Sequence, residues 1–360
     1  MDEAKRLTLE EISRKINVSR TTIYKVISGK GFVKDFTRQA VLKALEKYNY
    51  KQNRNARNLA LNRDYLVAYV GMKALYADYF SEIIFNGLNI AQRELEDHGL
   101  KLIMVETRAD APSKQIEQIR KLFNSGVKSF IIVPCDDILI INTIKNLKKN
   151  GCYVSILSRD VTEEKYYDCY VGVDYFKSGL LAAEIIGKML GKGNIQFFLN
   201  QDSKLSIKSN YLRHKGFVQG IGNFSEISIL PEIYLPNERG KAKQEVFDIL
   251  RKNHIDGIVD FTYYLLETSE AMVEAGCEKS IRLVGFDLYA SIEKYILSSV
   301  IDAIIFQDLR GQAYTAVKLL FDLMCYEKKI MKKKHYSRLD IIMSTNLDCY
   351  QEEYMGNYWQ

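Results

Sequence analysis

The sequence LTLEEISRKINVSRTTIYKVISGKG, residues 7–31, predicts two short helices joined by a tight turn. Thr8 is placed to cap the first helix, with Glu11 three residues later as in a capping box. Asn17 stands where the chain must reverse, because asparagine adopts the left-handed conformation more readily than most residues. Ser19 is expected to cap the second helix. Each helix has an apolar stripe at helical spacing, formed by Leu9, Ile12 and Ile16 in the first and by Val18, Ile23, Val26 and Ile27 in the second.

The outer face of the second helix has the side chains that a reader of the DNA major groove needs. Arg and Lys hydrogen-bond to guanine edges, and Ser and Thr hydroxyls reach bases or phosphates. The alternative is an ordinary helical hairpin with a polar outer face. The candidate DNA-binding residues of this stretch are Thr8, Ser19, Arg20, Thr21, Thr22 and Lys25.

A third amphipathic helix follows, and the three together resemble a known module. It starts near Lys34, ends at Asn49-Tyr50, and has Val41, Leu42, Leu45 and Tyr48 as its apolar side. Residues 7–61 contain, without a gap, the motifs T-L-x-x-I, N-V-S-x-x-T-I-x-x-V-I-S, T-R-x-x-V-x-x-A-L-x-x-Y-N-Y and N-A-R-x-L. In these motifs the chain resembles the lactose-repressor (LacI/GalR) family of transcriptional regulators. The resemblance implies a helix-turn-helix DNA-binding headpiece at residues 1–49.

Residues 50–62 form a short, basic, glycine-free linker with a predicted role of its own. Arg54 and Arg57 suit contacts with phosphates and with the minor groove. In the LacI/GalR family this segment becomes a hinge helix on operator DNA, and a leucine wedges between base pairs. Leu59 is the matching residue; unstacking a base step costs a few kcal/mol, which the extra contacts of the bent DNA offset. The alternative is that Leu59 packs against the next domain.

The distribution of charge indicates a nucleic-acid partner for this segment alone. The chain of 360 residues has a net charge of +6. Residues 1–62 carry 14 Lys and Arg against 6 Asp and Glu, whereas the remaining residues carry 37 against 39. The basic excess therefore belongs to the headpiece and linker, which is typical of a single nucleic-acid-binding module.

Several other protein classes are disfavoured by the sequence. There is no apolar run long enough to span a membrane and no signal peptide, so a cytoplasmic protein is expected. The six cysteines contain no C-x-x-C pair and the four histidines do not cluster, so no metal site and no cofactor are predicted. Neither a Ser-His-Asp arrangement nor a pair of carboxylates is evident, and the protein is not expected to be an enzyme.

From Tyr65 onward, short apolar runs alternate with longer amphipathic stretches. Buried apolar strands joined by helices indicate parallel sheets with helices on both faces. The expected strands are YLVAYVGM, LKLIMVE, SFIIVP, YVSILS, NIQFFL, GIVDF, RLVGFD and DAIIF. The expected helices cover residues 81–98, 113–124, 138–150, 175–190, 213–220, 241–253 and 309–326.

Residues 63–360 are similar to the effector-binding and dimerisation domain of the same family and to periplasmic sugar-binding proteins of the ribose type. The similarity implies two doubly wound parallel-sheet subdomains that close on a ligand. The N-subdomain is expected at about 63–174 and 308–340, and the C-subdomain at about 175–307 together with the final strand segment. The predicted fold class is thus a helical headpiece followed by a periplasmic-binding-protein-like α/β region.

Ligands of such sheets bind beyond the carboxyl ends of the strands. Transferred position by position, the similarity implies that Tyr79 and Phe80 stack on the apolar face of a sugar ring. It further implies that Arg159, Arg213, Asp287 and Gln307 hydrogen-bond the sugar hydroxyls, with Arg213 at the start of a helix. The alternatives are that Phe80 is a core residue, that Asp287 caps the following helix, and that Arg159 pairs with a surface acid.

Two candidate positions depart from the ribose-type pattern. Ser158 stands where that pattern has an aspartate before the arginine, and Thr262-Tyr263 stand where it has Asn-Asp. The lost carboxylate and amide groups would have bound hydroxyls, whereas Tyr263 and Tyr264 add aromatic surface. A saccharide-like effector is expected, and a non-sugar effector or a degenerate pocket is the alternative.

The sequence therefore predicts a homodimeric transcriptional repressor that binds a pseudo-palindromic operator, because two-fold protein symmetry requires two-fold sites. A small, saccharide-like effector is expected to change its operator affinity. A sugar-binding receptor with no DNA role is a remote alternative, which the basic headpiece disfavours. An enzyme acting on a phosphosugar is another, with Asp287 as its one candidate base.

Overall fold

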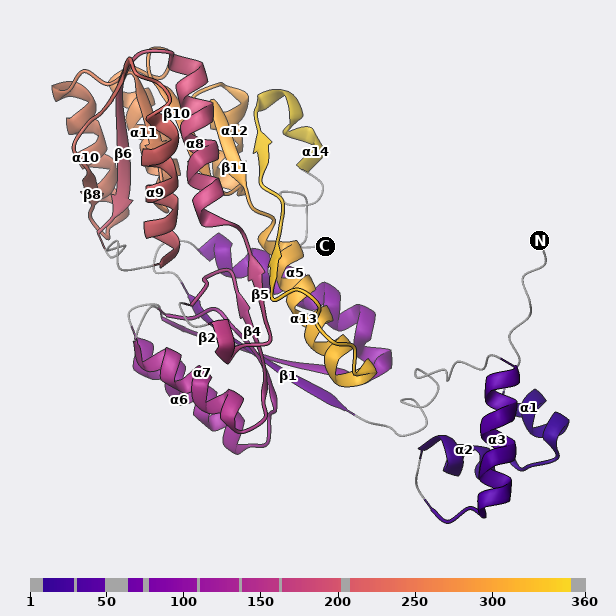
Figure 1. Cartoon of the computed structure of the whole chain (residues 1–360). Helices are drawn as coiled ribbons and strands as arrows, with labels where there is room; N and C mark the ends of the chain where they lie inside the picture. Colours follow the sequence, from indigo (N-terminus) through magenta and orange to yellow (C-terminus); the bar gives the residue numbers. More distant parts are fainter. Residues whose placement is uncertain are drawn as a thin grey trace, which may run out of the picture. The chain divides into compact units, whose positions relative to one another are not determined.

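The computed structural model describes residues 9–28, 31–48, 64–73, 78–108, 111–135, 138–161, 164–201 and 208–350. The predicted DNA contacts of Thr8, Arg54, Arg57 and Leu59 lie outside these residues. The chain divides into two compact units, residues 1–62 and residues 63–360 (Figure 1). Among the described helices, none combines the length and the apolar character needed to cross a membrane.

Three helices form the first unit, namely α1 (Leu9–Ile16), α2 (Arg20–Ser28) and α3 (Asp35–Lys47). Asn17 adopts a φ of 50°, so the predicted left-handed turn between α1 and α2 is present. The Oγ of Ser19 accepts a hydrogen bond from the backbone N–H of Thr22 at 3.1 Å, which caps α2. The core of this unit is formed by Ile12, Ile23, Val26, Val33, Val41 and Ala44.

The apolar side of α3 differs from the predicted one at a single position. Leu42 was expected on the buried side, but it is 51% exposed. Ala44 is buried instead, while Leu45 and Tyr48 pack against the core. The reason is the helical repeat, because Val41 shares a face with residues three, four and seven positions later and not with its direct neighbour.

The second unit contains two sheets, and we call the parts built on them the N-lobe and the C-lobe (Figure 1). The N-lobe sheet has the order β12-β5-β4-β3-β1-β2. Its strands are β1 (Tyr65–Lys73), β2 (Leu100–Arg108), β3 (Ser129–Ile132), β4 (Tyr153–Leu157), β5 (Cys169–Gly172) and β12 (Lys334–Tyr336). All its strand pairs within the described residues are parallel.

The C-lobe sheet has the order β13-β11-β10-β9-β6-β7, and β8 also pairs with β6. The edge strand β13 runs antiparallel to β11, whereas the other described pairs are parallel. The strands are β6 (Gly193–Asn200), β7 (Ile227–Ile229), β8 (Ile233–Leu235), β9 (Gly257–Asp260), β10 (Arg282–Phe286), β11 (Ala303–Phe306) and β13 (Asp340–Ile342).

Helices cover both faces of each sheet, as buried parallel strands require. In the N-lobe, α5 (Asp78–Leu95) and α13 (Leu309–Tyr326) lie on one face, and α6 (Pro112–Asn124) and α7 (Ile138–Lys149) lie on the other (Figure 1). In the C-lobe, α8 (Tyr175–Leu190) packs with α9 (Lys208–Ile221), and α10 (Arg239–Lys252) packs with α11 (Leu265–Ala275). Shorter helical segments are Glu96–His98, Glu164–Tyr166, Ala290–Ile292, α12 (Glu293–Leu297), Ser344–Asn346 and α14 (Asp348–Tyr350).

All eight predicted strands are present, but two predicted helix starts, at Arg213 and at Ser81, lie several residues too late. Helix α9 begins at Lys208, so Arg213 lies in its second turn and does not open it. The residues from 208 to 212 have no apolar repeat that would indicate a helix from the sequence. Helix α5 likewise begins at Asp78, so Tyr79 and Phe80 belong to its first turn.

The described chain passes between the lobes at three places, after β5, after β11 and after β12, and Ser337 connects all three. Its backbone N–H donates to the carbonyl oxygen of Gly172 at 2.8 Å. Its Oγ lies 3.2 Å from that oxygen and 3.2 Å from the carbonyl oxygen of Gln307. The Nε2 of Gln312 donates to the Ser337 Oγ at 2.9 Å and also to the Gln307 carbonyl. We call Ser337 and Gln312 the crossover clamp.

Replacing Ser337 with alanine is expected to lower the free energy of unfolding of the second unit by about 1–2 kcal/mol. The hydroxyl holds two crossovers, and its removal leaves the buried Gln312 amide without one acceptor. Urea denaturation followed by circular dichroism measures the change. Ser125→Ala is the matched control, because the Ser125 Oγ also donates to a carbonyl, that of Leu122 at 2.8 Å, but at an exposed helix end. Equal effects of the two substitutions would contradict a special role for the clamp.

Candidate functional sites

The outer face of α2 presents the predicted DNA-binding side chains to solvent. Ser19, Arg20, Thr21 and Lys25 are exposed and Thr22 is half-buried. The Arg20 Nη1 lies 3.9 Å from the Glu10 carboxylate, and both side chains are more than half exposed. A surface ion pair of this kind contributes little, so it does not prevent Arg20 from binding another anion. The face therefore has the chemistry that base and phosphate contacts need.

Two phenylalanines that the sequence reasoning missed add apolar surface to the same unit. Phe32 and Phe36 are 87% and 88% exposed, although Val33 between them is buried. Apolar side chains can contact thymine methyl groups or enter between base steps. Their sequence signal is an aromatic residue on either side of a core valine, in a stretch that is otherwise polar.

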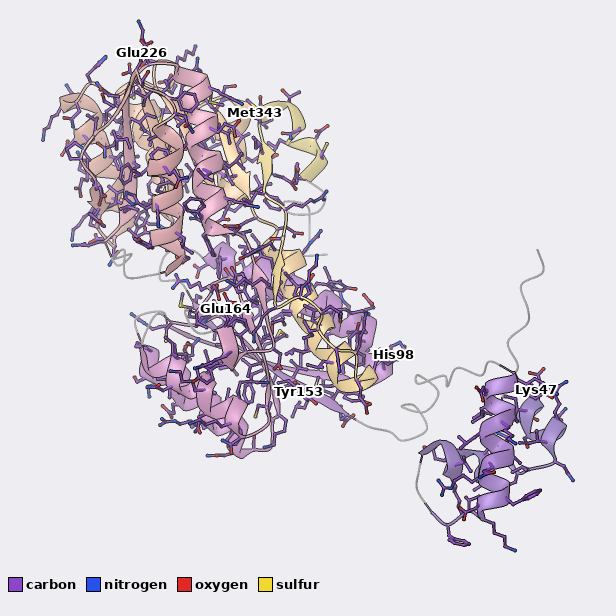
Figure 2. The ribbon with its side chains drawn as sticks, in the orientation of Figure 1. Lys47, His98, Tyr153, Glu164, Glu226 and Met343 are labelled. Carbon is purple, nitrogen blue, oxygen red and sulfur yellow. The ribbon has the colours of Figure 1, made fainter. Side chains whose placement is uncertain are left out.

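The remaining candidates lie beyond the carboxyl ends of strands in both lobes. Ser158 and Arg159 follow β4, Thr262 follows β9, Asp287 follows β10 and Gln307 follows β11. Tyr153, the first residue of β4, lies far from the C-lobe, whereas Glu164, beyond the end of β4, lies near the junction of the lobes (Figure 2). The carboxyl ends of the N-lobe strands are thus directed toward the C-lobe. Ligands of parallel sheets bind beyond such strand ends.

Arg159 and Tyr79 are among the candidate residues that make direct contacts between the lobes. The Nη2 of Arg159 donates a hydrogen bond to the Tyr263 hydroxyl at 3.0 Å, and its Nη1 lies 3.6 Å from the Met72 sulfur. The ring of Tyr79 stacks on that of Tyr289, with 4.1 Å between centroids and 9° between planes. The side chains predicted to hold a ligand therefore also hold the lobes together.

A charged and aromatic group occupies the C-lobe side. The Nε2 of Gln307 donates to the Asp287 carboxylate at 2.5 Å. The Arg213 guanidinium is buried over two rings, at 4.2 Å from the Phe286 centroid and 5.1 Å from the Tyr175 centroid. Burial raises the pKa of Asp287, while the Gln307 hydrogen bond and the Arg213 charge act in the opposite direction. The group combines a cation, a carboxylate and an amide, which together can donate to and accept from hydroxyls.

Tyr79 links the N-lobe to this group electrostatically. Burial raises its pKa well above the usual value, and the nearby Asp287 carboxylate is the next largest cause. The Tyr175 hydroxyl donates to the Ser158 carbonyl at 3.0 Å, and burial raises the pKa of Tyr175 against the influence of the Arg213 charge. The structure thus brings together Tyr79, Arg159, Arg213, Asp287 and Gln307, which we call the cleft group.

Three predicted residues are used elsewhere. Phe80 was expected to stack on a ligand, but it packs against the N-lobe core, four residues before the fully buried Ile84 on the same side of α5. Thr262 is buried, and its Oγ1 lies 2.5 Å from the Asp260 carboxylate and accepts from the backbone N–H of Tyr264. Ser158 is 3% exposed, and its carbonyl accepts from the hydroxyls of Tyr170 and Tyr175.

The sequence reasoning missed Tyr175, Tyr289 and Asp260. Asp260 is fully buried at the end of β9 and accepts from the Thr262 backbone N–H at 2.7 Å and from the Thr268 hydroxyl at 2.6 Å. Burial raises its pKa, and these hydrogen bonds oppose the rise. The aspartate that ends the apolar run GIVD was the available signal.

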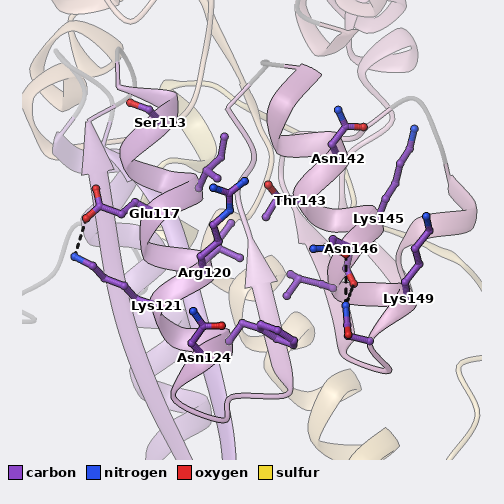
Figure 3. Close-up of a pocket in the computed structure, with 15 residues that line it drawn as sticks. Ser113, Glu117, Arg120, Lys121, Asn124, Asn142, Thr143, Lys145, Asn146 and Lys149 are labelled. Atoms are coloured by element: carbon purple, nitrogen blue, oxygen red, sulfur yellow. Dashed lines mark hydrogen bonds and ion pairs between the residues drawn. The ribbon is translucent and has the colours of Figure 1, made fainter.

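One large cavity lies away from the cleft group. It is a groove of about 790 Å³ between α6 and α7 (Figure 3). Arg120, Lys121, Lys145 and Lys149 line it, with Glu117 paired to Lys121 at 2.8 Å. The groove lies between two helices that cover one face of the N-lobe sheet, and not beyond the carboxyl ends of its strands. It is therefore not the site where a ligand of a parallel sheet is expected.

Comparison with protein families gives two matches. Residues 67–329, most of the chain, match the periplasmic binding protein domain, and residues 8–53 match the bacterial regulatory proteins of the lacI family. Both the predicted fold class and the predicted family resemblance are thereby confirmed.

Two curated relatives align with this chain over most of their length. The sucrose operon repressor of Lactococcus lactis is 26% identical over 295 residues, 80% of this chain and 85% of that protein. The HTH-type transcriptional regulator MalR of Clostridium butyricum is 25% identical over 325 residues, 88% of this chain and 93% of that protein.

Solved structures show the same α/β fold at low identity. A glucose-galactose binding protein from Geobacillus stearothermophilus is 19% identical with a TM-score of 0.69, over 79% of this chain and 99% of that one. A solute binding protein from Bacillus halodurans with bound myo-inositol is 19% identical with a TM-score of 0.72, over 81% of this chain and 99% of that one. The chain therefore belongs to the periplasmic binding protein domain family and, with its helix-turn-helix headpiece, is a DNA-binding regulator of the lacI family of bacterial regulatory proteins.

Proposed function

We propose that this regulator is a repressor that binds a two-fold symmetric operator as a homodimer, and that a sugar or sugar derivative bound between the lobes changes its operator affinity. One observation carries the proposal. The contacts between the lobes, from Arg159 to Tyr263 and from Tyr79 to Tyr289, are made by residues that could also contact a ligand there. Ligand binding and lobe placement are therefore coupled through the same side chains.

The coupling has a thermodynamic limit. A ligand shifts an equilibrium between two lobe arrangements only by the difference in its affinities for them. The hydrogen bond between Arg159 and Tyr263 stabilises one arrangement of the lobes. A sugar that replaces Tyr263 as the partner of the Arg159 guanidinium stabilises a different arrangement. A coupling free energy of about 1–3 kcal/mol would change operator affinity about 5- to 150-fold.

The chemistry of the cleft group supports a polyhydroxylated ligand. Arg159 and Arg213 can donate, Asp287 can accept, and the Gln307 amide can do both. Tyrosine rings nearby offer apolar faces of the kind that the C–H face of a sugar ring contacts. The names of the relatives agree with this chemistry, because one represses a sucrose operon and one structural neighbour binds glucose or galactose.

A non-sugar effector is the second candidate, and one observation favours it. The Thr262 hydroxyl already has partners inside the C-lobe. The Ser158 carbonyl already accepts from Tyr170 of the N-lobe and from Tyr175 of the C-lobe. Fewer groups are then left for hydroxyls than a plain monosaccharide site would offer. Thermal shift with sugars, sugar phosphates, polyols and nucleobases separates the two candidates, because a ligand of the folded state raises its stability.

Replacing Arg20 with alanine is expected to weaken binding to the selected operator about 5- to 150-fold, the equivalent of about 1–3 kcal/mol for a base contact. The full chain is first used to select its operator from random duplex DNA, and fluorescence anisotropy then measures affinity for that operator and for unrelated DNA at one salt concentration. Lys25→Ala is tested in the same way.

Lys43→Ala is the matched control, because Lys43 is an exposed cation on α3. It is expected to leave the selectivity between operator and unrelated DNA unchanged. If Arg20→Ala weakened both DNAs equally, its role would be phosphate contact alone. If no DNA sequence could be selected, the repressor proposal itself would be wrong.

A further inference from the structure

A second cavity, of about 230 Å³, adjoins the cleft group. It is smaller than typical sites for drug-sized ligands, and its size suits a single ring. Its walls come from the start of α5, the starts of α10 and α11, and the segment after β10. The lining residues are Asp78, Tyr79, Glu82, Arg239, Tyr263, Leu266, Glu267, Tyr289, Ala290 and Ser291.

The cavity shares side chains with the cleft group. Tyr263 lines it and accepts the hydrogen bond from Arg159 at 3.0 Å. Tyr79 also lines it and is close enough to Asp287 for that carboxylate to raise its pKa. A ligand that lies in the cleft group and contacts either tyrosine would therefore be next to the cavity.

The lining is aromatic and rich in acceptors. Three tyrosines contribute apolar ring faces, and three carboxylates stand against one arginine. Glu267 is 6% exposed, with the Arg239 Nε at 3.4 Å from its carboxylate. Asp78 pairs with Lys73 at 3.1 Å on the surface. Ionised carboxylates only accept hydrogen bonds, so a ligand that fits must donate them.

We propose that this cavity is a second sugar subsite, which holds the outer ring of a disaccharide whose other ring lies in the cleft group. Hydroxyls of the outer ring donate to Glu82 and Glu267, and its C–H face lies against a tyrosine. The proposal rests on the proposed sugar effector and names its class. A monosaccharide fills the cleft group and leaves the subsite to water.

Isothermal titration of the full chain with glucose, galactose, sucrose, maltose and cellobiose tests the subsite. At least one disaccharide is expected to bind 10-fold or more tightly than the monosaccharides. Ser291→Trp fills the cavity from an exposed position and is expected to remove this gain while leaving monosaccharide affinity within two-fold. Ser298→Trp, at an exposed serine that does not line the cavity, is the matched control and is expected to keep the gain.

Glu82→Gln is the second variant, because this exposed carboxylate can be neutralised without disturbing the core. It is expected to weaken disaccharide binding several-fold and monosaccharide binding not at all. Equal affinities for mono- and disaccharides in the unmodified chain would overturn the subsite and leave the sugar effector standing. A disaccharide gain that survives both Ser291→Trp and Glu82→Gln would also overturn it. Binding of no sugar at all would overturn the sugar effector together with the subsite.

Discussion

Replacing Gly179 with alanine is expected to destabilise the C-lobe by about 3 kcal/mol or more. A Cβ at this position in α8 would lie 1.9 Å from the carbonyl oxygen of Arg213 and 2.7 Å from the backbone nitrogen of Phe217, both in α9. The contact is reciprocal, because a Cβ at Gly216 would lie 2.0 Å from the carbonyl oxygen of Phe176. Neither clash can be relieved by rotating a side chain, so the two helices would have to separate.

The separation would reach the cleft group as well. The carbonyl that meets Gly179 belongs to Arg213, whose guanidinium lies over the Phe286 ring. Moving α9 moves this guanidinium, so the fraction of Gly179→Ala protein that stays folded is expected to bind effector more weakly. Urea denaturation gives the loss of stability, and effector titration below the transition gives the loss of affinity.

Gly240→Ala is the matched control for Gly179→Ala. Gly240 also lies in a helix, α10, but a Cβ there would meet no atom within 4 Å. Alanine is favoured over glycine in a helix by up to about 1 kcal/mol, so this substitution is expected to be neutral or stabilising. If Gly179→Ala lowered the free energy of unfolding no more than Gly240→Ala does, the two helices could separate without cost and the prediction would be wrong.

The parts of the fold that could be predicted from sequence are those with a local cause. The strands β1 and β2 are long apolar runs, and α8 begins where Asp174 accepts from the backbone N–H of Lys177. The turn at Asn17 and the cap at Ser19 follow from the preferences of single residues. Such signals need no knowledge of what packs against them.

The parts that could not be predicted depend on partners far along the chain. Strand β5 is four residues long and is recognisable only through its neighbours β4 and β12. Lys334 ends a basic run of the sequence, yet it belongs to β12 and pairs with Asp160 at 3.2 Å and with Glu164. Lys334 and its two acidic partners are some 170 residues apart, and no local pattern records the pairing.

The candidate site divides in the same way. Asp287 and Gln307 were predictable because each follows a buried strand of a parallel sheet. Tyr289 was not, because its role comes from stacking on Tyr79 across the lobes. Phe80 was misplaced because the sequence shows two adjacent aromatics, while the start of α5 decides which of them faces the core.

Replacing Arg159 with alanine is expected to abolish the effect of the effector on operator affinity. Hydrogen bonds to a charged group contribute about 1.5–3 kcal/mol, which corresponds to a loss of effector affinity of about 10- to 150-fold. Operator affinity without effector is expected to change only as far as loss of the Tyr263 contact shifts the lobe arrangement, because the headpiece itself is unchanged. Arg251→Ala is the matched control, since the Arg251 guanidinium lies 5.7 Å from the Phe247 ring centroid within α10 and outside the cleft group. If Arg159→Ala unfolded the second unit, the arginine would be structural.

Tyr263→Phe then separates the two roles of Arg159, which are to hold the lobes together and to hold the ligand. This substitution removes the hydroxyl that accepts from Arg159 at 3.0 Å and keeps the ring. If the contact sets the lobe arrangement, Tyr263→Phe changes operator affinity in the absence of effector, and Arg159→Ala adds little to that change in the double variant. The effector still binds Tyr263→Phe, because Arg159 remains to hold it. If the effects of Tyr263→Phe and Arg159→Ala on operator affinity were independent and additive, Arg159 would act through the ligand alone. The contact between the lobes would then result from closure and would not cause it.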